Sequence, residues 1–206
     1  FARLGRKRWG ALRAGWGGVG FGGDPEAEPR PWVSLPAEAL EWGRRTAGEG
    51  RRWVSVNLGV GENPRKRIGG EFEERLLAGL RDGGWRIFLD TGEGGEERVR
   101  VERLAGRLRA AGCGEDEIVI WRGSLAGFGA LIAASKLYVG YDSACQHLAA
   151  ALGVPTIDIF AGYSSPQMPE RWRPWGPAKV TTVVVEPQGA EPEKVLDLAR
   201  GTRVKA

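Results

Sequence analysis

Histidine and cysteine are scarce in this sequence, with one and two residues among 206. A structural zinc site needs several such ligands at close spacing. No spacing of that kind surrounds Cys113 or Cys145, and His147 is the only histidine. The sequence therefore predicts no metal site, and we expect both cysteines to be the reduced thiols of a cytoplasmic protein.

Long hydrophobic runs are also missing. No segment approaches the roughly 20 apolar residues of a membrane-spanning helix, and no secretory signal is visible. The first residue is Phe1 rather than methionine, so we expect the chain to begin inside a longer reading frame. With 42% hydrophobic residues the composition is not that of a disordered chain. The formal net charge of +4 is mild, and it fits a small polyanionic ligand or an anionic membrane surface without demonstrating either.

The first fifty residues differ from the rest of the chain. Basic residues between positions 3 and 13 alternate with apolar ones, which favours a short amphipathic helix, and residues 24–36 have the proline-rich composition of a linker. A further helix is predicted over 36–47, opened by Pro36. We therefore expect residues 1–50 to be an N-terminal helix and interdomain linker, and residues 51–206 to form one folded domain.

From Trp53 onward, apolar runs alternate with segments of helical periodicity. The runs are nearly continuous in apolar residues, as in strands that are covered on both faces. Such alternation implies a parallel sheet with right-handed crossovers, so the predicted fold class is α/β, a Rossmann-like sheet of about six strands. The predicted strands are 53–58, 86–89, 118–121, 137–140, 156–160 and 182–185, and the predicted helices are 71–81, 96–110, 125–134, 143–152 and 192–199.

Four loops of this pattern are unusually polar or rich in glycine. In a parallel sheet, ligands bind at the carboxyl ends of the strands. The four loops all follow predicted strands, so we expect them to converge on one edge of the sheet. They are residues 57–70, 90–95, 141–147 and 161–176.

The segment from Leu137 to Pro155 points most directly to a ligand. An apolar run ends in Asp142-Ser143, an alanine-rich helix starts at once, and a Gly-Val-Pro break leads into the next apolar run. Such a turn aims backbone N–H groups and a helix N-terminus at whatever lies above the sheet edge. This arrangement is suited to an anion, above all a phosphate.

These residues resemble the donor-binding half of glycosyltransferase family 9, the ADP-heptose:lipopolysaccharide heptosyltransferases. The most specific part is the pattern Asp-Ser-x-x-x-His-x-Ala-Ala-Ala-x-Gly-x-Pro, which begins at Asp142. The resemblance covers about residues 50–190. It implies the C-terminal half of a two-domain GT-B fold, with the nucleotide-sugar site in this half. In that family the catalytic base belongs to the N-terminal acceptor domain, for which this sequence offers no counterpart.

The resemblance implies a glycosyltransferase that binds a nucleotide-diphosphate sugar, foremost ADP-heptose, for inverting transfer to the lipopolysaccharide core. We expect the chain to be inactive alone and to work with the missing acceptor domain, without a cofactor or nucleic acid. We expect it in the cytoplasm, peripheral at the inner face of the inner membrane. Two alternatives stay open: a non-catalytic module that binds nucleotide sugars, and a GT-B enzyme whose donor is a UDP- or GDP-sugar.

The resemblance also assigns residues to the donor diphosphate. They are Asp142, Ser143, Ala144, His147, Lys66 and Gly59. Plainer interpretations exist for each group: Asp142 and Ser143 as an N-cap, His147 as a structural histidine, and the loop around Lys66 as a solvated basic turn. Cys145 lies where relatives usually carry glycine, so we expect its side chain to narrow the pocket.

For the nucleoside, the resemblance implies an acidic residue after the second strand and an apolar slot after the third. Glu93 is preferred over Glu96 for the ribose, with helix N-terminal acids as the plainer interpretation. Trp121 and Leu125 are the candidates for the slot. Arg171 is a possible anion contact, although tryptophan packing with surface arginine explains its segment as well, and Asn57 is a further candidate contact at the end of the first strand.

Overall fold

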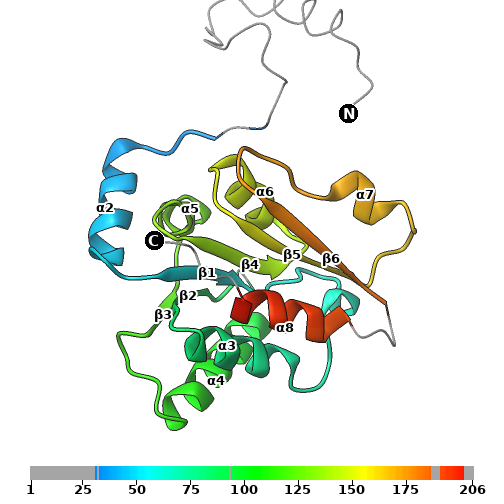
Figure 1. Cartoon of the computed structure of the whole chain (residues 1–206), viewed down its shortest axis with the longest axis horizontal. Coiled ribbons are helices and arrows are strands. Elements are labelled where there is room, and N and C mark those ends of the chain that lie inside the picture. Colours follow the sequence, from blue (N-terminus) through cyan, green and yellow to red (C-terminus); the bar gives the residue numbers. More distant parts are fainter. Residues whose placement is uncertain (1–30, 32, 93, 187–190, 202–206) are drawn as a thin grey trace, which may run out of the picture.

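The computed structural model describes residues 31, 33–92, 94–186 and 191–201 (Figure 1). Six parallel strands form one sheet in the order β3-β2-β1-β4-β5-β6. This confirms the predicted Rossmann-like α/β layout. The strands are β1 (Trp53–Asn57), β2 (Arg86–Asp90), β3 (Ile118–Trp121), β4 (Leu137–Tyr141), β5 (Thr156–Ala161) and β6 (Val180–Val185).

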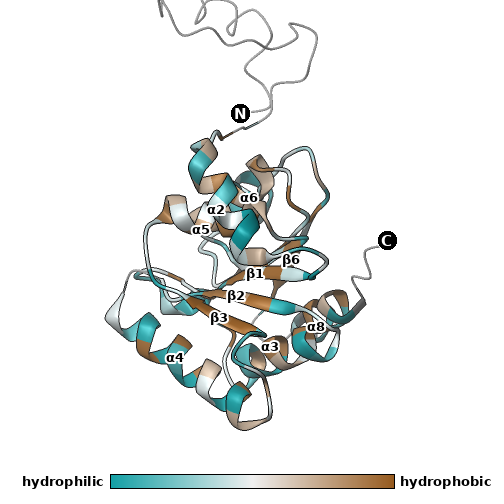
Figure 2. Ribbon diagram, turned by 90° about the vertical axis from the view of Figure 1, so that its left-hand side faces the viewer, coloured by the Kyte–Doolittle hydropathy of each residue, from teal (hydrophilic) through white to brown (hydrophobic). Residues whose placement is uncertain are grey.

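Helices cover both faces of the sheet (Figure 1). One face carries α2 (Ala37–Ala47), α5 (Leu125–Ala133) and α6 (Ala144–Ala151), and the other carries α3 (Phe72–Asp82), α4 (Gly95–Ala110) and α8 (Glu191–Gly201). In Figure 2 the strands are mostly brown between the two helical layers, while α4 shows many hydrophilic residues. Both layers therefore bury apolar side chains against the sheet, as expected for a parallel sheet that is covered on two sides.

The alternation of side chains along the strands divides the core into two parts. Val54 and Val56 pack with leucines of α3 and α4, whereas Trp53 points to the opposite layer. There the Trp53 ring stacks on Phe88 with centroids 3.9 Å apart, and its indole N–H donates to the carbonyl of Ala47 at 2.6 Å. This polar contact of a buried indole ties the end of α2 to the sheet.

The structure adds two short elements that the sequence pattern did not predict. They are a 3-10 turn, η1 (Pro64–Lys66), and helix α7 (Met168–Trp172), both inside segments expected to be loops. Each is too short for an apolar periodicity to show, and each has a proline in its first turn. The amphipathic helix expected between positions 3 and 13 lies outside the described residues.

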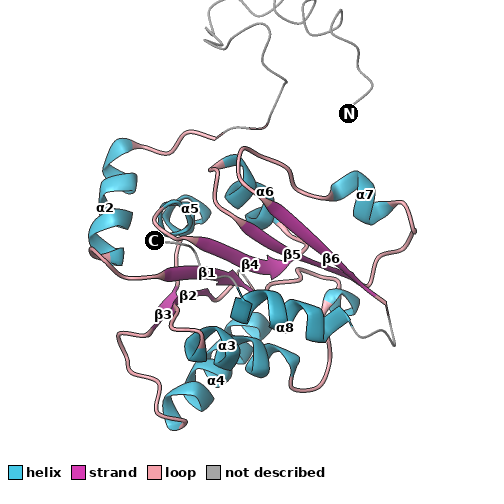
Figure 3. Ribbon diagram, in the orientation of Figure 1, coloured by secondary structure: helices cyan, strands magenta, loops and turns pink. Residues whose placement is uncertain are grey.

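The strand order reverses between β1 and β4, which places a crevice beyond their carboxyl ends. The arrowheads of the parallel strands point to one end of the sheet (Figure 3). Gly162, just after β5, has φ +61°, and a Cβ there would overlap the backbone of Arg65 and Lys66. Glycine at this position therefore lets the η1 turn lie against the end of β5 and holds Lys66 beside the crevice. Within the described residues, no helix has the length and apolar character needed to cross a membrane.

Candidate functional site

The crevice between β1 and β4 holds a buried ion pair. Lys66 Nζ lies 2.6 Å from Asp142 Oδ2 and also donates to the Asp142 backbone carbonyl at 3.2 Å. The second carboxylate oxygen, Oδ1, accepts from Gln146 Nε2 at 2.9 Å. The Lys66 and Asp142 side chains are only 23% and 11% exposed. Two sequence-predicted residues are thus brought together, and Asp142 holds Lys66 rather than presenting a bare carboxylate to an anion.

The amino end of α6 carries no side-chain cap. Ser143 stands at the N-cap position with extended backbone, φ −157° and ψ 178°, but its side chain accepts no hydrogen bond from the helix. The hydroxyl instead donates to Asn57 Oδ1 at 3.4 Å. The first amides of an α-helix have no partner within the helix and carry partial positive charge. Here Ser143 does not cap these amides, and the Lys66 ammonium binds Asp142 directly before them, an arrangement that attracts an anion.

His147 and Ala144 are exposed at this end of α6, whereas Cys145 and Gln146 are buried. No hydrogen bond of the His147 imidazole occurs among the described residues, so the structure gives no support to a bonded structural histidine. Partial burial lowers the pKa of His147, against an opposing effect of the Asp142 charge. Cys145 belongs to the apolar cluster between α6 and the sheet, so its side chain does not narrow the exposed amide end as expected.

The glycine-rich loop after β1 is already occupied by a carboxylate of the chain. The amides of Val60 and Gly61 both donate to Glu97 Oε1, at 2.7 and 3.1 Å. The amide of Gly59 donates to Asn57 Oδ1 at 3.1 Å. The diphosphate role predicted for Gly59 stays a prediction, although its N–H group is used within the loop.

Glu97 was not among the predicted site residues; the acidic residues predicted in this region were Glu93 and Glu96. Glu96 is exposed, and Glu93 lies outside the described residues. A signal for Glu97 was present, because it precedes Val101 by four positions and so extends the buried stripe of α4 by one turn. An acid on the apolar face of a helix needs a partner, and here the partner is the loop after β1.

Asn57 links the three neighbouring strands β2, β1 and β4. Its Nδ2 donates to Asp90 Oδ2 at 2.6 Å, and its Oδ1 accepts from the Gly59 amide and from Ser143 Oγ. Burial is the main cause that raises the pKa of Asp90, with the Asn57 hydrogen bond opposing it. The structure therefore gives Asn57 a supporting position beneath the crevice.

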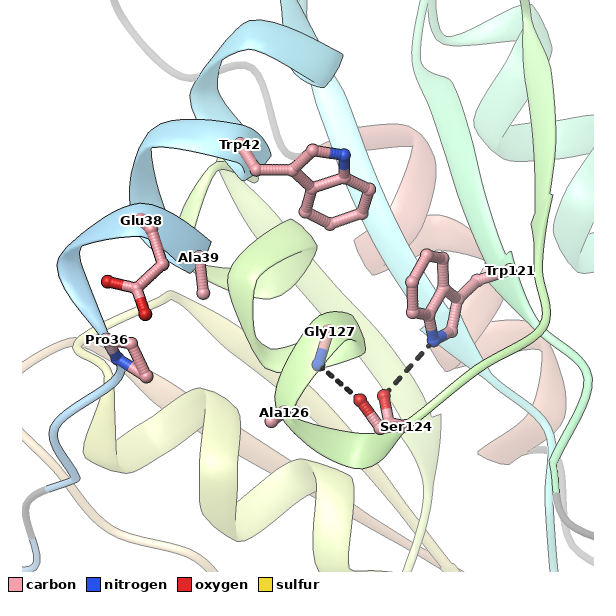
Figure 4. Close-up of a pocket in the computed structure, with 8 residues that line it drawn as sticks. All are labelled: Pro36, Glu38, Ala39, Trp42, Trp121, Ser124, Ala126 and Gly127. Carbon is pink, nitrogen blue, oxygen red and sulfur yellow. Dashed lines mark hydrogen bonds between the residues drawn. The ribbon is translucent and has the colours of Figure 1, made fainter.

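A cavity of about 380 Å³ lies beside Trp121. The Trp121 and Trp42 ring centroids are 5.3 Å apart, and the Trp121 indole donates to the Ser124 carbonyl at 3.3 Å (Figure 4). Leu125, the other predicted slot residue, is 50% exposed and does not line this cavity. The lining residues are Pro36, Glu38, Ala39, Trp42, Trp121, Ser124, Ala126 and Gly127. The part of α2 in lining this cavity was not predicted. A helix was expected over 36–47, but residues 1–50 were assigned to a segment outside the folded domain.

Arg171 is exposed on α7, and its side chain forms no hydrogen bond or ion pair with described residues. Its neighbour Arg173 pairs with Glu170 on the same short helix. In the same described part of the chain, no three histidine, cysteine or acidic side chains are grouped to hold a metal ion. Among the described residues, the groups best placed to bind an anion are therefore Lys66 and the amino end of α6.

Comparisons with known proteins identify the family of this chain. The model of glycosyltransferase family 9 (heptosyltransferase) matches residues 34–198. Lipopolysaccharide heptosyltransferase 1 of Pseudomonas aeruginosa is 38% identical over 90 residues, which cover 44% of this chain and 22% of that protein.

Solved structures show the same fold. The family 9 glycosyl transferase of Veillonella parvula has a TM-score of 0.60 at 14% identity, covering 89% of this chain and 49% of that chain. The Escherichia coli ADP-heptose lps heptosyltransferase II has a TM-score of 0.58 at 20% identity, covering 84% of this chain and 54% of that chain. The Escherichia coli heptosyltransferase WaaC with ADP has a TM-score of 0.53 at 25% identity, covering 70% of this chain and 42% of that chain. The chain spans about half the length of these solved relatives, or less.

Proposed function

The chain belongs to glycosyltransferase family 9, and from this membership and the site geometry we propose that it is the donor-binding half of a heptosyltransferase. Its ligand is a nucleotide-diphosphate sugar, with ADP-heptose as the first candidate. The reaction is inverting transfer of the sugar to a lipopolysaccharide core acceptor. The relative solved with ADP, at 25% identity, and the curated heptosyltransferase relative support the choice of nucleotide and reaction.

One observation carries the proposal: the Lys66 ammonium is held 2.6 Å from Asp142 at the uncapped start of α6. A diphosphate seated there receives backbone N–H donors and a lysine cation together. The exposed His147 lies on the same turn as a further donor, and the Ser143 hydroxyl becomes one if it leaves Asn57 Oδ1. Asp142 supports the site from behind by holding Lys66.

Sugar transfer requires negative charge to build up on the departing nucleoside diphosphate. Fixed donors that point at this charge stabilise the transition state more than the ground state. The α6 amides and Lys66 supply that field without moving during the reaction. The base that accepts the proton of the acceptor hydroxyl is assigned to a separate acceptor-binding domain, because the chain spans 54% or less of its solved relatives.

The nucleoside is assigned to the side of the sheet edge that carries β2 and β3. The cavity beside Trp121 supplies an aromatic wall for a base. The ribose contact of Glu93 and the contact of Leu125 remain predictions, as does an anion contact of Arg171. The whole enzyme is assigned to the cytoplasmic face of the inner membrane, where its acceptor is made.

Calorimetric titration of the full chain with ADP, AMP, UDP and GDP tests this function. ADP should bind at least tenfold more tightly than AMP, because the second phosphate adds charge-assisted hydrogen bonds. Tight binding of UDP or GDP with no binding of ADP would assign a different donor. Equal affinity for ADP and AMP would show that the site does not bind a diphosphate.

A further inference from the structure

Gln146, the third residue of α6, is an uncharged polar side chain with no exposed surface. It lies on a helix face that is otherwise apolar. Its neighbours on that face are Cys145, Ala149 and Ala150. An amide buried without hydrogen bonds costs roughly 1–3 kcal/mol. Packing alone therefore does not explain glutamine at this position, and its hydrogen bonds indicate what it does.

The Nε2 of Gln146 donates to Asp142 Oδ1 at 2.9 Å, across one turn at the start of α6. The other oxygen of the same carboxylate holds Lys66 at 2.6 Å. A carboxylate bound on one oxygen only can turn about its last torsion, which is soft. Binding on both oxygens fixes the plane of the carboxylate, and this plane sets where the Lys66 ammonium lies.

A second buried polar side chain lies within reach of the charges of Asp142 and Lys66. Asp158, on β5, has no exposed surface, and its Oδ2 accepts from Thr182 Oγ1 at 3.1 Å. Gln146 Oε1 and Asp158 Oδ1 are both buried and without a hydrogen-bond partner among the described residues. The Tyr138 hydroxyl of β4 is a third buried polar group without such a partner, and a proton on Asp158 would add a donor to this layer.

The surroundings of Asp158 favour this proton. Burial is the main cause that raises its pKa to about 7, the Asp142 charge adds to the rise, and Thr182 and Lys66 oppose it. Tyr138 of β4 and Cys145 of α6 are further titratable groups on this side of the sheet, and burial raises the pKa of Tyr138 so that it stays a neutral phenol. At mildly acidic pH a neutral Asp158 therefore does not compete with Asp142 for the Lys66 ammonium.

We propose that Gln146 is a positioning residue that acts through Asp142 to fix the Lys66 ammonium at the amino end of α6. The proposal rests on the proposed function, since it assigns the purpose of this alignment to diphosphate binding. Gln146 touches no substrate in this arrangement. Its effect reaches the ligand through two further side chains.

Two substitutions separate this role from simple packing. Gln146→Met keeps the length and loses the donor, so ADP affinity should fall about tenfold at every pH, the worth of one charge-assisted hydrogen bond. Gln146→Glu keeps the shape but donates only when protonated. Its ADP affinity should be close to that of wild type at pH 5.5 and should fall by more than tenfold at pH 8, because a carboxylate would then face Asp142.

Thr156→Val is the matched control. Thr156 is the first residue of β5, two positions before Asp158, and its hydroxyl makes one buried hydrogen bond to the Val154 carbonyl at 2.9 Å. This variant should unfold at a lower temperature and bind ADP like wild type at pH 5.5 and pH 8. His147 titrates in the same range, so each variant is compared with wild type at the same pH.

A second readout needs no nucleotide. Lysines of the full chain are labelled with ¹³C-methyl groups, and the Lys66 resonance is assigned by its loss in Lys66→Arg. In wild type it should differ from the resonances of exposed lysines, and in Gln146→Met it should move toward them. If wild type bound no diphosphate, the proposed function would fail while this readout still decided the position of Lys66. Unchanged Lys66 resonances in both Gln146 variants would overturn the inference.

Discussion

Two turns meet at the crevice of this molecule, and they treat negative charge in opposite ways. The turn after β1 is rich in glycine, yet two of its amides already bind the carboxylate of Glu97. The turn after β4 leads into α6, and its N-cap residue Ser143 does not cap that helix. Glycine content would have selected the first turn as the phosphate seat, whereas the hydrogen bonds select the second.

The charges beside the two turns strengthen the difference. The first turn contains an anion of its own, so a phosphate there would meet a like charge. The second turn lies beside the Lys66 ammonium of η1, which pairs with Asp142 of this turn at 2.6 Å. Under the proposed function, the diphosphate would meet a like charge at the first turn and a cation at the second, and partly buried charges are only weakly screened.

The largest effect is expected from Asp158, the buried acid beneath the second turn. Its pKa rises from 3.8 to about 7 in the folded chain, so the folded state binds the proton more tightly than the unfolded state. Stability contributed by that proton is therefore lost as the pH rises from about 4 to 7. At about 1.4 kcal/mol per unit this amounts to roughly 4 kcal/mol.

Asp158→Asn should remove this loss while keeping an oxygen for Thr182. Urea unfolding of both proteins between pH 5 and pH 8 measures it: wild type should weaken over this range, and the variant should weaken much less. Parallel pH profiles would show that Asp158 is ionised in the folded chain.

Lys66→Met tests the second turn directly. Loss of the ammonium should reduce ADP affinity by about 10- to 100-fold, as for a hydrogen bond between charged groups. The control is Lys136→Met, which removes the same charge from an exposed lysine that precedes β4 at the opposite edge of the sheet. Equal calorimetric affinities for the two variants would remove Lys66 from the site.

The arrangement of the elements was largely predictable from the sequence. Strand–helix alternation gave the parallel sheet, because continuous apolar runs are rare outside buried strands, and boundaries shifted by two residues at most. Helix α7 was missed, since a five-residue helix shows no periodicity. The third predicted strand, Ile118–Trp121, has the predicted limits.

The site was predictable only in part. Asp142 and Lys66 were named from the resemblance, but their contact joins residues 76 positions apart and required the fold. Glu97 and Gln146 were overlooked as partners because both resemble ordinary helix residues. Their positions on buried helix faces are the physical sign that separates them from solvated neighbours.

Glu97→Ala should break the first turn. The amides of Val60 and Gly61 lose their acceptor, which should lower the free energy of unfolding by about 1–3 kcal/mol. Added pyrophosphate should restore more stability to this variant than to wild type, because a second amide pair becomes open to an anion. Glu96→Ala, at the exposed neighbouring position, is the control in thermal unfolding with and without pyrophosphate. Identical curves for the two variants would contradict the role of Glu97.

The smallest effect separates the two serines that open helices. Ser124 caps α5 by accepting from the Gly127 amide at 3.2 Å, whereas Ser143 opens α6 without capping it. Ser124→Ala should therefore cost about 1 kcal/mol of stability, and Ser143→Ala less than about half of that. If a diphosphate takes the place of the missing cap, Ser143→Ala should still lower ADP affinity about threefold, a small loss because the hydroxyl must give up its bond to Asn57 to donate to the phosphate. A larger stability loss in Ser143→Ala than in Ser124→Ala would mean that the α6 amides are capped in solution, and the two turns would then no longer differ.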